Sequence, residues 1–154
     1  DHLYNEMGLR RVYFSGFEPV KNTPLENRKP CPPYREYRLY QASFLLRDYG
    51  FKFEDFKKIL TEKGFLPNID PKVALAKINC DDFPIDINEA GYYEILKIPG
   101  IGPQTARKII LLRQNRPINK LSDLEKLIGP GLARSVAKYI DLKDKRLTYF
   151  SRQS

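Results

Sequence analysis

The feature that most limits the fold of this chain is a short turn, Pro99 to Gly102, between two stretches of helical periodicity within residues 95–110. Pro99 has no backbone N–H and cannot continue a helix. Gly100 and Gly102 permit backbone angles and close approaches that a Cβ would prevent. Pro103 suits the first position of a second helix. That helix has an apolar stripe for close packing, formed by Ala106, Ile109 and Ile110.

The chemistry around this turn suits an anionic partner. The first N–H groups of a helix have no partner within the helix and point outward as anion donors. No acidic residue lies between Glu94 and Asp123. The basic residues of that segment are Lys97, Arg107, Lys108, Arg113, Arg116 and Lys120. Charge alone favours a solvated helix face, but charge together with the glycine turn favours nucleic-acid binding through phosphates.

A second, weaker copy of the turn follows. An offset of 31 residues sets Pro130-Gly131-Leu132-Ala133 over the first turn and residues 137–140 over residues 106–109. Ala133 then replaces the second glycine, which makes a tight backbone approach less favourable there. Ser122 and Glu125 have the spacing of a capping box, which predicts the start of the preceding helix. Two packed helical pairs would share a core that neither could form alone.

Residues 83–150 resemble tandem helix-hairpin-helix domains, (HhH)2, such as those of DNA-uptake receptors and DNA-repair proteins. The likeness rests on Asn88-Glu89-Ala90, on Leu96 before the turn, on the turn itself and on the Ala-Arg-Lys of residues 106–108. It implies that hairpin N–H groups bind the phosphates of duplex DNA. It also implies a K⁺ or Na⁺ ion held by hairpin carbonyls, which by position are those of Leu96, Ile98 and Ile101.

The same resemblance assigns DNA contacts residue by residue. In the first hairpin they are Gly100, Ile101, Gly102, Gln104, Thr105, Arg107 and Lys108. In the second they are Gly131, Arg134, Ser135 and Lys138. Phosphate contacts position a protein without reading bases, so the expected binding does not depend on the DNA sequence.

The N-terminal half predicts one strand, one loop and several helices. Residues 11–17 have the β-branched and aromatic character of a strand, for which residues 146–150 could supply a partner. Residues 19–33 contain five prolines and predict a loop. Helices are predicted over residues 35–49 and 54–64 and from Asp70-Pro71 onward, with Asp70 as the cap. The tyrosines of the first long helix, Tyr34, Tyr37 and Tyr40, are expected in the core more than against a base.

Residues 12–51, together with Asp70-Pro71-Lys72, resemble the C-terminal part of radical-SAM DNA modification and repair proteins related to spore photoproduct lyase. The similar elements are Tyr13-Phe14-Ser15, Thr23-Pro24-Leu25, residues 35–42 and Tyr49-Gly50-Phe51. Such proteins hold a 4Fe-4S cluster and S-adenosylmethionine with a CxxxCxxC triplet, which this chain does not contain. The resemblance implies a mainly α chain, with residues 1–80 as the remnant of a partial α/β barrel and residues 81–154 as the tandem hairpin domain.

Composition sets the remaining limits. A net charge of +8 favours an anionic partner, and no 18-residue apolar run predicts a membrane span. The chain begins with Asp1 and not with Met, from which we expect that it was cut from a longer protein. Two cysteines, Cys31 and Cys80, with the lone His2 form no zinc set, and they suggest a reduced, cytoplasmic protein.

Two functions therefore compete. The first is non-sequence-specific DNA binding as the tail of a radical-SAM enzyme, whose catalysis would lie outside this chain because no nucleophile, base or acid set is present here. The alternative is an interaction module that docks a repair partner such as a DNA glycosylase. Steep salt dependence would distinguish the first from the second.

Overall fold

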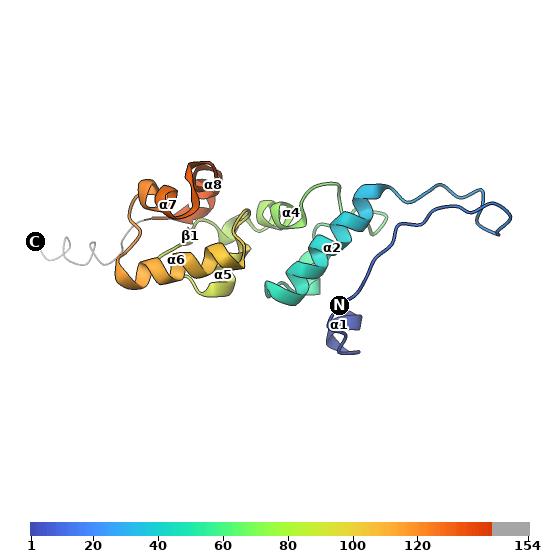
Figure 1. The fold of residues 1–154 in the computed structure, drawn as a ribbon, viewed down its shortest axis with the longest axis horizontal. Helices are drawn as coiled ribbons and strands as arrows, with labels where there is room; N and C mark the ends of the chain where they lie inside the picture. Colours follow the sequence, from blue (N-terminus) through green and yellow to red (C-terminus); the bar gives the residue numbers. More distant parts are fainter. Residues whose placement is uncertain (143–154) are drawn as a thin grey trace, which may run out of the picture. The chain divides into compact units, whose positions relative to one another are not determined.

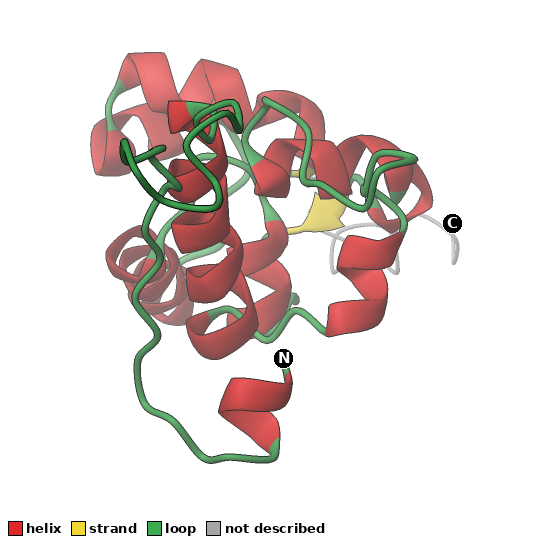
Figure 2. Ribbon diagram, turned by 90° about the vertical axis from the view of Figure 1, so that its right-hand side faces the viewer, coloured by secondary structure: helices red, strands yellow, loops and turns green. Residues whose placement is uncertain are grey.

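A computed structural model describes residues 1–142 of the chain and shows a mainly α-helical protein, which confirms the predicted fold class (Figures 1 and 2). Two compact units divide the sequence, Asp1–Ile78 and Asn79–Ser154. The predicted partner strand at residues 146–150 lies outside the described residues. None of the helices within residues 1–142 is long and apolar enough to cross a membrane.

The first unit contains four helices, α1 (His2–Asn5), α2 (Pro33–Asp48), α3 (Phe53–Lys57) and α4 (Pro71–Ile78). The proline-rich segment ends where α2 begins, with Pro33 at the first helical position, where a missing N–H costs nothing. Asp70 caps α4 as predicted, because its Oδ1 accepts the N–H groups of Lys72 at 2.8 Å and Val73 at 3.3 Å.

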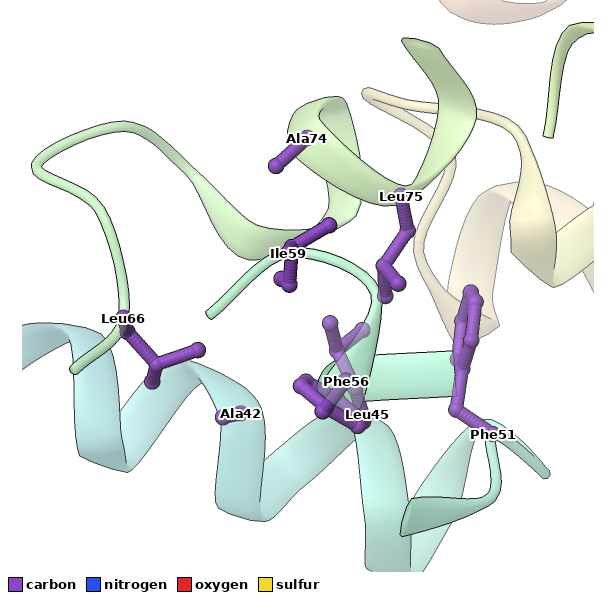
Figure 3. Packing of buried hydrophobic residues seen from close by; sticks show 8 residues of the cluster. All are labelled: Ala42, Leu45, Phe51, Phe56, Ile59, Leu66, Ala74 and Leu75. Atoms are coloured by element: carbon purple, nitrogen blue, oxygen red, sulfur yellow. The ribbon is translucent and has the colours of Figure 1, made fainter. Parts of the chain in front are cut away.

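One apolar cluster holds the first unit together (Figure 3). The rings of Phe51 and Phe56 meet edge to face with their centroids 6.4 Å apart. Lys72 lies buried at the start of α4, and its Nζ is 4.9 Å from the centre of the Tyr49 ring. Burial lowers the pKa of Lys72 from 10.5 to about 7, against an opposing effect of Asp70. The cluster consists of Ala42, Leu45, Phe51, Phe56, Ile59, Leu66, Ala74 and Leu75.

The predicted strand at residues 11–17 is wrong, because these residues have no regular secondary structure. Side chains of α2 bond the backbone groups that a neighbouring strand would have paired. The Tyr40 hydroxyl accepts the Phe14 N–H and donates to the Phe14 carbonyl, both at 3.0 Å. Glu36 accepts the Gly16 N–H at 2.8 Å. The segment is therefore fastened to a helix instead of a sheet.

Two further expectations for the first unit need correction. The helix predicted over residues 54–64 ends at Lys57, and a turn follows in which the Thr61 hydroxyl accepts the Phe65 N–H at 3.2 Å. Such local side-chain bonds compete with helical ones. The expectation of a buried tyrosine series is also wrong for Tyr34 and Tyr37, which are 37% and 60% exposed, whereas Tyr40 is partly buried by its contact with Phe14.

The second unit consists of short helices in two hairpins and a two-stranded sheet. The first hairpin is α5 (Tyr92–Lys97) and α6 (Pro103–Asn115), and the second is α7 (Leu121–Ile128) and α8 (Pro130–Val136). The 3₁₀ turns η1 (Cys80–Asp82) and η2 (Ala137–Tyr139) precede the strands β1 (Ile85–Asp86) and β2 (Ile140–Asp141). The strands pair in parallel, Ile85 opposite Ile140, and so join the start of the unit to the end of the second hairpin.

Both hairpins contribute to the core of this unit. The first supplies Ile95, Leu96, Ile98, Ile101, Ala106 and Ile109, all at most 1% exposed. The second supplies Leu124, Ala133 and Val136, which are fully buried. The helical spacing of these residues explains why the sequence predicted paired helices here.

Candidate nucleic-acid interface

The first hairpin turn is built as the sequence predicted. Helix α5 ends at Lys97, and Ile98 turns the chain into an extended conformation, with φ −67° and ψ 121°. The Ile101 N–H then donates to the Ile98 carbonyl at 3.1 Å, which closes the turn. Helix α6 begins at Pro103, and the Gly102 carbonyl accepts the Ala106 N–H at 2.9 Å. The N-terminal N–H groups of a 13-residue helix are thereby presented beside the turn.

The two glycines of the turn differ in whether their backbone angles require glycine. Gly100 has φ +88°, which side chains rarely adopt. A Cβ there would lie 3.0 Å from Leu132 Cδ1 and 3.6 Å from Val136 Cγ1, so the turn packs closely against α8. Gly102 has φ −102° and ψ 179°, a conformation open to any residue. The prediction that its backbone angle requires glycine is therefore wrong.

The second hairpin begins earlier than the sequence alignment placed it. Gly129, with φ +85°, forms the turn, and α8 starts at Pro130. Pro130 therefore matches Pro103, and the buried Ala133 and Val136 match Ala106 and Ile109. The structural offset is 27 residues, and the predicted offset of 31 is wrong because it followed a repeated Pro-Gly pair instead of the turn. Ser122 lies inside α7, which begins at Leu121, so the predicted capping box is also wrong.

The predicted first-hairpin contacts differ in their accessibility. The side chains of Gln104, Arg107 and Lys108 are exposed on α6, whereas Thr105 and Gly102 are partly exposed. Ile101 is only 1% exposed and its N–H donates to the Ile98 carbonyl, so its backbone and its side chain are both buried in the turn. Arg107 and Lys108 lie about one turn beyond the first N–H groups of α6 and so extend the same surface.

Hydrogen bonds and ion pairs divide the basic residues of the acid-free segment into two groups. Lys97 pairs with Asp82 at 3.9 Å, Arg116 pairs with Asp123 at 3.6 Å, and Arg113 donates to the Ile87 carbonyl at 2.9 Å. No hydrogen bond or ion pair within residues 1–142 involves the side chains of the other three, Arg107, Lys108 and Lys120. Lys120 was not among the predicted contacts, although its place within the acid-free segment could have pointed to it.

The predicted contacts of the second hairpin are all exposed on one side of α8 and η2, but internal interactions already involve three of them. Arg134 lies 3.8 Å from the Glu125 carboxylate, and the Ser135 hydroxyl donates to the Leu132 carbonyl at 2.8 Å. The Lys138 ammonium lies 4.8 Å from the centre of the Tyr139 ring. Gly131 lies in the first turn of α8, with open space where a Cβ would be. The second hairpin is thus less available to a ligand than the first.

The two implied cofactors fit this chain differently. Helix α5 ends just before the turn, and the last carbonyls of a helix lack helical partners, which provides the kind of oxygen ligand a monovalent cation needs. Of the three implied ligands, the Ile98 carbonyl also accepts the Ile101 N–H. A 4Fe-4S cluster held by three thiolates does not fit, because the two cysteines of the chain lie in different compact units. No cluster of three His, Cys, Asp or Glu side chains within the described residues could hold a metal ion.

Comparison with known proteins agrees with this geometry. Residues 83–141 match the helix-hairpin-helix motif family, which spans both hairpins from the start of the unit to β2. No curated protein and no solved structure matches the chain. The family match associates the second unit with nucleic-acid binding in general.

Proposed function

We propose that the second unit binds duplex DNA through its phosphates, without reading the sequence. One observation carries the proposal: the exposed Arg107 and Lys108, which have no ion-pair partner among residues 1–142, lie next to the N-terminus of α6 in a helix-hairpin-helix. A phosphate at this position would meet helix N–H donors, the positive end of the helix dipole and two cationic side chains. None of these three interactions depends on the base attached to the phosphate, so the binding does not read the DNA sequence.

Each part of the first hairpin has a role in this proposal. The N–H groups of Gly100, Gly102, Gln104 and Thr105 would donate to phosphate oxygens, and Arg107 and Lys108 would add charge-assisted contacts. A K⁺ or Na⁺ ion on the carbonyls of Leu96, Ile98 and Ile101 would add positive charge behind the turn. The second hairpin would contact the other strand through Arg134, Ser135 and Lys138.

The test compares Gly102→Asp and Arg107→Glu with the unchanged chain in fluorescence-anisotropy titrations of a labelled duplex. The backbone angles of Gly102 are open to any residue, so the aspartate places a negative charge at the turn without backbone strain. We expect each variant to bind about tenfold or more weakly, the loss typical of one charge-assisted hydrogen bond. Lys63→Glu is the control, since it makes the same charge change as Arg107→Glu at an exposed site in the first unit.

The proposal fails if both variants stay folded and bind duplex DNA as tightly as the unchanged chain. Salt provides a second criterion. If affinity for duplex DNA falls steeply and log-linearly with salt, the binding is through phosphates. The alternative, docking of a protein partner such as a glycosylase through a largely apolar face, predicts binding that hardly changes with salt.

We also propose that the unit is the DNA-binding tail of a radical-SAM repair or modification protein. The support is the resemblance of residues 12–51 and 70–72 described above. Because the cluster does not fit this chain, its ligands would belong to a further part of the protein. Anaerobic purification of the natural protein with an iron count tests this: about four irons per chain support the proposal, and none contradicts it.

A further inference from the structure

The two hairpins place an arginine at the same structural position but in different electrostatic surroundings. With the offset of 27 residues set by Pro103 and Pro130, Arg107 of α6 corresponds to Arg134 of α8. No carboxylate among the described residues pairs with Arg107. Arg134 lies 3.8 Å from Glu125 on α7. The second hairpin therefore carries its own internal anion where a phosphate contact would form.

Helix α8, which carries Arg134, packs against the first hairpin turn. The position that a Gly100 Cβ would occupy is 3.0 Å from Leu132 Cδ1 and 4.0 Å from the Ser135 hydroxyl, so α8 lies directly against that turn. Arg134 is the neighbour of Ser135 and is 72% exposed.

We propose that Glu125 sets the DNA affinity of the second hairpin by competing with phosphate for the Arg134 guanidinium. The inference rests on the proposed DNA binding of this unit and adds a residue that limits it. While DNA is absent, Arg134 pairs with Glu125. DNA binding at the second hairpin has to displace that carboxylate, and the displacement reduces the gain from the new phosphate contact.

Because the Glu125–Arg134 pair is partly exposed to solvent, displacing Glu125 from Arg134 should cost little free energy. Glu125 and Arg134 side chains are 34% and 72% exposed, and pairs of this kind contribute little to stability. Glu125→Gln should therefore tighten duplex binding about two- to fivefold.

A double-mutant cycle tests competition against a general charge effect. Binding constants are measured over a range of salt concentrations for the unchanged chain, Glu125→Gln, Arg134→Gln and the double variant. Glu89→Gln is the matched control, since it removes one exposed carboxylate of the same unit, one that forms no ion pair within the described residues. We expect Glu125→Gln to tighten binding, and we expect no further gain from it once Arg134 is glutamine.

Two sets of results would contradict either the competition at Arg134 or the proposed DNA binding itself. If Glu125→Gln has no effect beyond that of Glu89→Gln, or if its gain persists without Arg134, the competition is wrong and the DNA site itself stands. If the unchanged chain binds no DNA and Arg107→Glu changes nothing, the proposed function fails, and the inference fails with it.

Discussion

The side-chain amide of Asn88 forms two hydrogen bonds with the backbone of Ile118. Its Oδ1 accepts the Ile118 N–H at 2.8 Å, and its Nδ2 donates to the Ile118 carbonyl at 3.1 Å. Asn88 lies between β1 and α5, whereas Ile118 lies in the loop between the two hairpins and is fully buried. One side chain thereby satisfies both backbone groups of a buried loop residue and fixes the second hairpin relative to the first.

Asn88→Ala should destabilise the second unit by about 2 kcal/mol, because it leaves the N–H and carbonyl of buried Ile118 without these partners. Urea denaturation followed by circular dichroism measures the change. Asn119→Ala is the control, since Asn119 is exposed in the same loop and its loss should change the stability by less than about 0.5 kcal/mol. Equal stabilities of the two variants would show that the Asn88 bonds contribute nothing.

Gly100→Ala should destabilise the hairpin unit for two separable reasons. The backbone angle, φ +88°, costs about 1 kcal/mol for a residue with a Cβ, and the 3.0 Å contact with Leu132 adds a steric cost. Adding Leu132→Ala should remove the steric part while introducing its own packing loss, which the Leu132→Ala single variant measures. Gly131→Ala is the control, because its Cβ would meet open space in a helix. A Gly100→Ala chain as stable as the Gly131→Ala chain would contradict the assigned role.

Stability of the first unit should depend on pH through Lys72. Its pKa is about 7 in the folded chain and 10.5 when unfolded, so the unfolded state binds more protons between these values and stability rises with pH there. The slope is at most about 1.4 kcal/mol per pH unit. Below pH 7 both states are charged, and the cost of burying the ammonium is fully present.

Lys72→Met keeps an apolar side chain of similar length and removes the charge. We expect the variant to be more stable than the unchanged chain near pH 7, with a difference that shrinks toward pH 10.5. Urea denaturation at several pH values measures it. A difference that stays constant over this range would show that Lys72 does not titrate as its burial indicates.

Helical periodicity and the first glycine turn were enough to predict the paired helices around Gly100, because local sequence decides both. The register of the second hairpin was not predictable from the Pro-Gly pair at residues 130–131, because those residues begin α8 and the turn is at Gly129. A comparison of longer segments gives the observed register, because Ile-Gly-Pro and Ala-Arg recur at residues 128–130 and 133–134, 27 positions after residues 101–103 and 106–107. The buried Ala133 and Val136 then take the places of Ala106 and Ile109.

For the candidate site, the sequence located the basic segment. It could not show which of these side chains form ion pairs or hydrogen bonds within the chain. Arg113 and Arg107 look equivalent in the sequence, yet only Arg113 reaches a backbone carbonyl, that of Ile87. The strand expected at residues 11–17 failed for a related reason, because a hydroxyl on α2, from Tyr40, took the hydrogen bonds that a strand would have needed.

If a monovalent cation occupies the first hairpin, stability should depend on the ion and not only on ionic strength. Replacing K⁺ by a large organic cation at equal ionic strength should lower the melting temperature and weaken duplex binding. Ion binding to the folded state adds stability that grows with the logarithm of its concentration. The control is Gly129→Ala, which strains the second turn at φ +85° without changing the three carbonyls, so it should lower the melting temperature in both salts and keep the K⁺ dependence. Identical melting in both salts would contradict a cation at these carbonyls.

The basic residues of the acid-free segment should separate into residues that bind DNA and one that holds the fold. Lys108→Gln and Lys120→Gln each remove a cation without a partner among the described residues, so each should reduce the salt slope of duplex binding by about 0.9 with little change in stability. Arg113→Gln removes the bond to the Ile87 carbonyl and should destabilise the chain by about 1–3 kcal/mol while leaving the slope unchanged. Anisotropy titrations over a salt series and urea denaturation measure both quantities on the same samples. Equal slopes for all three variants, whether reduced or not, would show that the partners of these side chains do not decide their role.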